Sequence, residues 1–194
     1  MSRRLPIAST LIVALAVAAM VALGVWQLRR ADEKAALLAR NERAAGLSAA
    51  VPWPRGPKEA ERALYRRSEV DCLRVRSLAE RAGRAASGAM GWAHVATCDL
   101  AQGGQADVAL GWSRDPAPVA WAGGRVAGFI GPHGHGVRLV AAPPQAGLEA
   151  LAPPNPADLP NNHLSYAVQW FLFAATALAI YALALRQRWR SRAS

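Results

Sequence analysis

Two apolar runs, one near each end of the chain, constrain the fold more than any other feature of the sequence. The first covers residues 5–28, and its only polar residues are Ser9, Thr10 and Gln27. The second covers residues 164–185 and contains no acidic or basic residue. About 20 apolar residues are needed for a helix to cross the roughly 30 Å hydrocarbon core of a bilayer. Both runs are therefore predicted to be transmembrane helices.

A cleaved signal peptide is the alternative interpretation of the first run, because small residues are frequent near Ala18 and Ala19. The apolar region of a signal peptide is about 7–15 residues long. The run over residues 5–28 is longer, which favours a helix that stays in the mature protein.

The positions of the basic residues predict which side of the membrane holds the two chain ends. Basic residues close to a membrane span are enriched on the cytoplasmic side. Arg29 and Arg30 favour the opposite orientation, but they are outnumbered by arginines at the two chain ends. These are Arg3, Arg4, Arg186, Arg188, Arg190 and Arg192. We therefore expect a multi-pass protein of the bacterial inner membrane with both termini in the cytoplasm and the central domain in the periplasm.

The expected domain boundaries follow from this topology. They are a cytoplasmic N-terminus (1–4), a first transmembrane helix (5–28), a periplasmic domain (29–162), a second transmembrane helix (163–185) and a basic cytoplasmic tail (186–194).

The net charge of +10 does not indicate a nucleic-acid-binding protein. All 13 acidic residues lie between the two apolar runs together with 17 of the 23 basic residues, so the central domain carries only +4. The remaining basic residues lie beside the membrane spans, where they suit contact with anionic lipid headgroups.

The central segment is predicted to be a helical extension followed by a small β domain. Residues 31–50 are rich in helix-forming residues and should continue the first helix. Three prolines within residues 51–57 should end it. Five short strands are then expected, separated by Gly and Pro turns, at residues 68–76, 92–98, 105–112, 125–130 and 137–141. This pattern favours a small antiparallel sheet or a partly open barrel. Residues 142–160 are expected to be an irregular Pro-rich linker.

The fold class predicted for the whole chain is therefore membrane α+β, with two transmembrane helices flanking the β domain.

Cys72 and Cys98 are the only cysteines, and both lie on expected strands. A disulfide between them suits an oxidising compartment, and two buried free thiols are the alternative.

The sequence contains no motif of a known catalytic site, so we do not expect an enzyme. GxSxG, HExxH and phosphate-binding loop patterns are all absent. His133 and His135 are two possible metal ligands in a glycine-rich turn, but a metal site needs at least a third ligand. His94 lies in a strand pattern and is expected to be structural.

The start of the second apolar run contains the candidate residues for binding a cofactor. On a helix, His163, Tyr166, Ala167 and Trp170 share one face. An imidazole next to two aromatic rings is suited to ligate and stack on a flat, apolar cofactor. The alternative is that these residues only anchor the helix at the membrane surface, where Tyr and Trp are enriched.

Both ends of the central segment resemble the Surfeit locus protein one family of cytochrome c oxidase assembly factors, in particular its bacterial members. The first helix ends in Gly24-x-Trp26-Gln27-Leu28-x-Arg30, and the last begins with His163-Leu164-x-Tyr166-Ala167-x-x-Trp170-Phe171. Leu110-Gly111-Trp112 and Val126-x-Gly128 are similar to two shorter motifs of the family, although the first has Leu110 where the family has arginine.

The resemblance implies that the protein assists the insertion of haem a into the catalytic subunit of cytochrome c oxidase. It implies transient binding of haem a with His163 as the candidate iron ligand. Tyr166, Trp170, Trp26 and Gln27 are then candidate residues of the haem site. The implied partners are the catalytic oxidase subunit, other assembly factors and membrane lipids. Two alternatives stay open at this point, a scaffold that binds no haem and an accessory subunit of the mature oxidase.

Overall fold

The computed structural model describes residues 6–191 of the chain. The predicted N-terminal segment 1–4, Leu5 and Arg192 lie outside the described residues. The chain divides into two compact units. One contains the chain up to Leu37 and from Pro160 onward, and the other contains residues 38–159.

The first unit contains one long helix and most of another, which continues past Leu37 into the second unit. Helix α1 (Ile7–Ala45) and helix α3 (His163–Arg190) contain the two predicted spans. Each is long and apolar enough to cross a membrane, and only 6% of its most apolar window is buried. A core helix of a soluble protein would be mostly buried, so these exposed apolar surfaces are consistent with a membrane protein. The predicted extension of the first helix is confirmed as far as Ala45.

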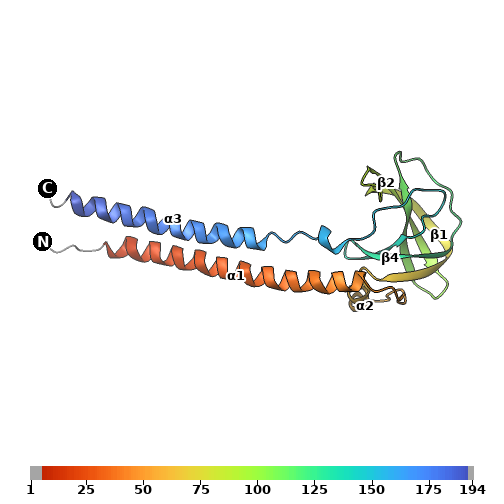
Figure 1. Cartoon of the computed structure of the whole chain (residues 1–194), viewed down its shortest axis with the longest axis horizontal. Helices are drawn as coiled ribbons and strands as arrows, with labels where there is room; N and C mark the ends of the chain where they lie inside the picture. Colours follow the sequence, from red (N-terminus) through yellow and green to blue (C-terminus); the bar gives the residue numbers. More distant parts are fainter. Residues whose placement is uncertain (1–5, 192–194) are drawn as a thin grey trace. The chain divides into compact units, whose positions relative to one another are not determined.

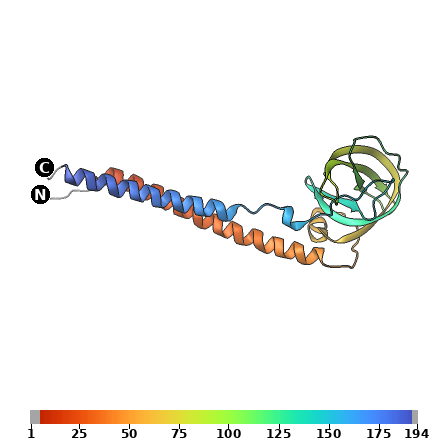
Figure 2. The same cartoon turned by 45° about the horizontal axis from the view of Figure 1, so that its top comes forward.

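Helices α1 and α3 lie side by side within their unit (Figures 1 and 2). The less exposed residues recur every three or four positions on each helix, which is the heptad spacing of a coiled-coil seam. On α1 they include Thr10, Val13, Val17, Met20, Gly24, Gln27, Ala31 and Lys34. On α3 they include His163, Ala167, Trp170, Ala174, Ala177 and Tyr181. The hydroxyl groups of Thr10 and Tyr181 form a hydrogen bond within this seam.

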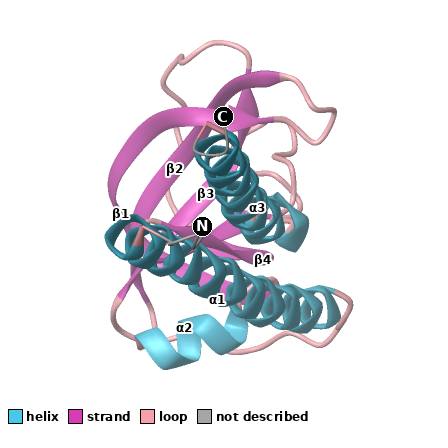
Figure 3. Cartoon of the chain, turned by 90° about the vertical axis from the view of Figure 1, so that its left-hand side faces the viewer, coloured by secondary structure: helices cyan, strands magenta, loops and turns pink. Residues whose placement is uncertain are grey.

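The second unit is a closed five-stranded barrel preceded by the short helix α2 (Pro57–Ala63). Each strand lies where the sequence predicts one. The strands are β1 (Arg67–Arg84), β2 (Met90–Leu100), β3 (Gln105–Ser113), β4 (Gly124–His133) and β5 (Gly136–Ala141). Their order around the barrel is β1-β2-β3-β5-β4, and several of them are seen curving around the barrel in Figure 3. The position of β4 beside β1 is the Greek-key arrangement, which is also found in OB-type barrels.

Two details of the barrel differ from the expected sheet. Strands β3 and β5 pair in parallel, with Val108 opposite Leu139, so the sheet is mixed and not purely antiparallel. The barrel is also closed, because β1 pairs with β4 through its first residues and with β2 through the rest. Register shifts follow Cys72 and Val75 in β1, and such bulges let a strand bend from one partner to the next.

Alternating residues of the strands fill the barrel. Val70, Val108, Leu110, Ile130 and Leu139 are each at most 1% exposed. Every second side chain of a strand points to the same face of the sheet, and this alternation of apolar residues is what predicts the strands from the sequence.

Residues 142–159 form a strap across the outside of the barrel, where an irregular linker was expected. Trp112 and Glu149 exchange two backbone hydrogen bonds, and the amide of Ala152 donates to the carbonyl of Arg84. Leu151 is 8% exposed and packs with Trp112 and Val140 in a second apolar cluster. The strap has no regular period, so the sequence pattern did not reveal that it is ordered.

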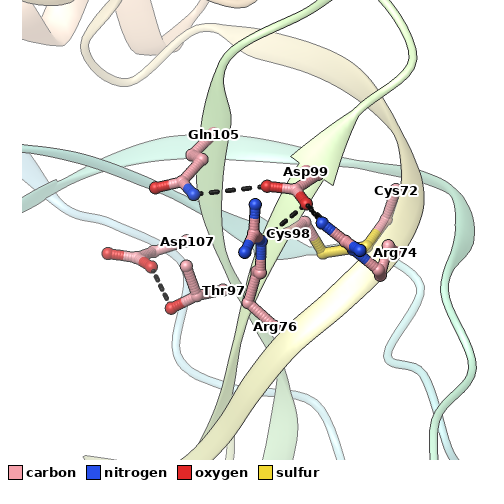
Figure 4. Close-up of a disulfide and its surroundings, with 8 residues drawn as sticks. All are labelled: Cys72, Arg74, Arg76, Thr97, Cys98, Asp99, Gln105 and Asp107. Carbon is pink, nitrogen blue, oxygen red and sulfur yellow. Dashed lines mark hydrogen bonds and ion pairs between the residues drawn. A yellow bond between two sulfur atoms is a disulfide. The ribbon is translucent and has the colours of Figure 1, made fainter.

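Cys72 on β1 and Cys98 on β2 are joined by a disulfide with a Cα–Cα distance of 5.3 Å. Both residues are at most 2% exposed. The bridge is shown beside the surface residues of the two strands in Figure 4.

Candidate functional site

The predicted haem ligand, His163, lies at the first position of α3 and faces Gln27 of α1. Its Nδ1 atom is 2.8 Å from the side-chain oxygen of Gln27. An amide oxygen only accepts hydrogen bonds, so Nδ1 carries the proton and donates it. An imidazole that carries only this proton keeps a free lone pair on its Nε2 atom. Two candidate residues that are far apart in the sequence are thus brought together at one end of the helix pair.

The three aromatic candidates, Trp26, Tyr166 and Trp170, differ in how exposed their side chains are. Trp26 and Tyr166 are 52% and 51% exposed and point away from the helix seam. Trp170 is half-buried, and its ring forms a T-shaped pair with the ring of Phe173 at a centroid distance of 6.1 Å. Tyr166 therefore does not share the buried side of the helix with Ala167, which is fully buried.

Close helix packing lies next to this site. A Cβ atom added to Gly24 would lie 2.7 Å from the ring of Phe171, so a larger residue would displace the ring. The side-chain amide of Asn161 also donates to the backbone carbonyl of Ala31 across 3.5 Å. Sequence analysis did not select Asn161 or Phe171 as site residues. The three-residue spacing of Gly24 and Gln27 on a predicted helix could have indicated that they share a face.

The barrel contains a Ser, His and Glu arrangement that sequence analysis missed. His94 is 1% exposed, its Nε2 atom is 2.7 Å from the Ser113 hydroxyl, and its Nδ1 atom is 3.9 Å from Glu80. The Ser113 hydroxyl donates its own proton to the carbonyl of Asp115. The serine oxygen therefore accepts from Nε2, and the imidazole does not act as a base toward it. This supports the structural role expected of His94.

His133 and His135 do not form part of a larger ligand group. His133 lies 3.8 Å from Asp107, and His135 is exposed. No cluster of three or more metal-ligating side chains occurs among residues 6–191.

A charged network covers the outer surface beside the disulfide (Figure 4). The Asp99 carboxylate accepts hydrogen bonds from Arg74 at 2.9 Å, from Arg76 at 2.6 Å and from Gln105 at 3.2 Å. The hydrogen bonds from Arg74 and then Arg76 hold the pKa of Asp99 below its ordinary value of 3.8.

The comparison with known families identifies a family that matches most of the chain. The model of the SURF1 family matches residues 14–175, a range that includes most of α1, the whole barrel and the first part of α3. A search of curated proteins finds no match to this chain. The matched range contains every candidate residue of the helix pair and extends over well more than half of the sequence. The chain therefore belongs to the SURF1 family, the Surfeit locus protein one family of cytochrome c oxidase assembly factors.

Proposed function

We propose that this protein assists the insertion of haem a into the catalytic subunit of cytochrome c oxidase by holding haem a transiently at the outer face of the membrane. His163 is the proposed ligand of the iron. Membership of the SURF1 family supports the part in oxidase assembly. The hydrogen bond between His163 and Gln27 carries the haem-binding part of the proposal.

That hydrogen bond leaves His163 in the form that a metal needs. Histidine ligands commonly donate their second ring nitrogen to an oxygen atom, which fixes the ring orientation and the tautomer. Gln27 supplies such an oxygen to Nδ1, and Nε2 stays available as a neutral nitrogen ligand. Gln27 is therefore a positioning residue for the imidazole in this proposal.

The surrounding residues suit a flat, apolar group. When bound, haem a supplies an iron that accepts an imidazole nitrogen as an axial ligand. The exposed rings of Trp26 and Tyr166 offer apolar surface at the flank of the helix pair. The contact between Gly24 and Phe171 closes the seam itself. Neither helix contains a second histidine, and a single imidazole suits temporary holding better than permanent retention.

The proposed location follows from the charges beside the spans. Arg186, Arg188 and Arg190 follow the apolar part of α3, and such residues favour the cytoplasmic side. The barrel would then lie in the periplasm of a bacterial cell, anchored in the inner membrane. We propose that it contacts the catalytic oxidase subunit and other assembly factors there.

The test is the visible spectrum of the detergent-purified protein from cells that synthesise haem a. We expect haem a absorbance in the wild type and its loss in His163→Ala. Gln27→Leu should keep the imidazole but bind less haem, because the ring loses its orienting partner. His135→Ala is the matched control, since it removes an exposed histidine of the barrel and should bind like the wild type.

A colourless wild-type protein would contradict haem binding. It would favour a scaffold, in which case oxidase activity should survive His163→Ala. Recovery of the protein in a fixed ratio with the active oxidase would instead favour an accessory subunit. An assembly factor should be recovered mainly with incomplete oxidase subunits.

A further inference from the structure

A cavity lies between the barrel wall and the strap. Its volume is about 310 Å³, and it is lined in part by Tyr65, Arg84, Arg138, Leu151 and Asp158. We propose that this cavity binds an oxyanion of the phosphate class, held by the guanidinium groups of Arg138 and Arg84 and by the hydroxyl of Tyr65.

Arg138 is the main reason for this inference. Its Nε atom is buried without a hydrogen-bond partner, and its guanidinium forms no ion pair with any residue between 6 and 191. The carboxylate whose charge acts on Arg138 is that of Asp107, its register partner on β3. That carboxylate already accepts a hydrogen bond from Thr97 at 2.8 Å and lies near His133. A partly buried cation without a partner is costly to the fold, so a bound anion is the simplest explanation.

Tyr65 adds a second unusual feature to the same cavity. The residue is 2% exposed and has a φ of 66°, a left-handed backbone conformation that is uncommon for a bulky side chain. Its hydroxyl makes no hydrogen bond to another described residue. Burial, followed by the negative charge of Asp158, raises the pKa of Tyr65. The phenol therefore stays protonated at neutral pH and can donate to an anion.

The charge of the cavity favours an anion over a cation. Asp158 is the only acidic residue among the described residues of the lining, and it pairs with Arg84 at 3.4 Å. Arg138 therefore contributes a positive charge that pairs with no acidic residue of the lining. A planar guanidinium presents parallel N–H groups that match two oxygens of a phosphate. Two guanidinium groups and a hydroxyl suit a tetrahedral oxyanion with several acceptor oxygens.

Phosphate could reach the cavity from a lipid headgroup or from a soluble molecule. Leu159 lines the cavity and precedes His163, the first residue of α3, by four positions. This closeness in sequence to a proposed membrane span makes a phospholipid headgroup one source. A free phosphate or a soluble phosphate ester is the other.

The experiment follows thermal unfolding of the full-length protein in phosphate-free maltoside detergent. Inorganic phosphate is added at constant ionic strength. A ligand that binds only the folded state raises the unfolding midpoint in a saturable way. We expect this rise in the wild type, and binding at least about tenfold weaker in Arg138→Gln, which loses charge-assisted hydrogen bonds. Arg125→Gln is the matched control, because Arg125 is an exposed barrel arginine paired with Glu69 and should respond like the wild type.

The unfolding temperature of Arg138→Gln in the absence of phosphate is a second test of the proposal. Arg138→Gln should then unfold at or above the wild-type temperature, because the unpaired cation is gone. Arg84→Gln, at a half-exposed position, provides a second variant and should also weaken phosphate binding. The absence of a saturable shift in the wild type, or an equal shift in wild type and Arg138→Gln, would overturn the proposal.

A final arm identifies the source of the phosphate. A short-chain phosphatidic acid, used below its micelle concentration, replaces inorganic phosphate. Binding that is tighter than for inorganic phosphate and is lost in Arg138→Gln would assign the site to a lipid headgroup. Equal binding of both probes would assign it to soluble phosphate. Neither result depends on haem, so the outcome is separate from the test of the proposed function.

Discussion

Gly128 has no room for a side chain, because an added Cβ would overlap with the carbonyl oxygen of Val140 on the neighbouring strand β5. This glycine is also the last residue of the Val126-x-Gly128 motif. A backbone oxygen in a paired strand cannot move aside as a flexible side chain can. The motif therefore has a structural explanation in the barrel wall.

We predict that Gly128→Ala destabilises the barrel by about 1–3 kcal/mol, the usual cost of overpacking. The measurement is chemical unfolding of the full-length protein in detergent. Gly136→Ala is the control, because the nearest atom to its added Cβ is 3.8 Å away. Equal stability of Gly128→Ala and wild type would show that β4 and β5 can separate without cost.

The ion pairs of Asp99 predict how the stability of the protein depends on pH. Its pKa is lowered in the folded state by Arg74 and Arg76. A lowered folded pKa contributes stability that is present above the ordinary carboxyl pKa and is lost as the pH falls through the folded value. We expect the wild type to lose stability below about pH 3.8 more steeply than Asp99→Asn, measured as unfolding midpoints between pH 7 and pH 3. Removing both arginine partners should flatten the wild-type profile in the same way, and identical profiles for all three proteins would contradict this role.

At the scale of elements, β1 and the strap decide the form of the second unit. Residues 68–76 alternate clearly enough to predict a strand, but β1 continues to Arg84 through a stretch that lacks this alternation. Its full length lets it pair with both β2 and β4 and so closes the barrel. The strap then covers part of the outer wall, where Leu151 and Trp112 pack together.

If the strap is part of the fold, Leu151→Ala should cost about 2–5 kcal/mol, as expected for a buried leucine. Leu73→Ala is the matched control, because Leu73 is 67% exposed on β1 and should change stability little. Unfolding curves of the two variants against wild type give the comparison. A strap that acts only as a linker would leave both variants as stable as the wild type.

At the scale of the whole molecule, the protein combines two apolar helices with a barrel that has its own core. The helix pair buries few of its residues, which suits a surrounding bilayer. The barrel contains the disulfide, which suits an oxidising compartment. The exposed helices support insertion in a membrane, and the disulfide supports the proposed position of the barrel outside the cytoplasm.

We predict that a green fluorescent protein fused to the C-terminus fluoresces in bacterial cells, because this reporter folds in the cytoplasm. An alkaline phosphatase inserted between Gly103 and Gly104, in the exposed turn before β3, should be active, because it needs the oxidising periplasm. The reverse pattern would place the chain ends outside the cell. It would also remove the proposed location of His163 at the outer membrane face.

The sequence by itself determined the two long apolar helices, the extension of α1, the positions of five strands and the family. Each of these depends on local composition or on the spacing of neighbouring residues. The tertiary structure alone decided the parallel pairing of β3 with β5, the closure of the barrel and the path of the strap. It also decided the hydrogen bond between His163 and Gln27 and the presence of Arg138 and Tyr65 in one cavity. The physical reason is that periodicity reports which residues are buried, whereas a contact between distant residues depends on how the whole chain packs.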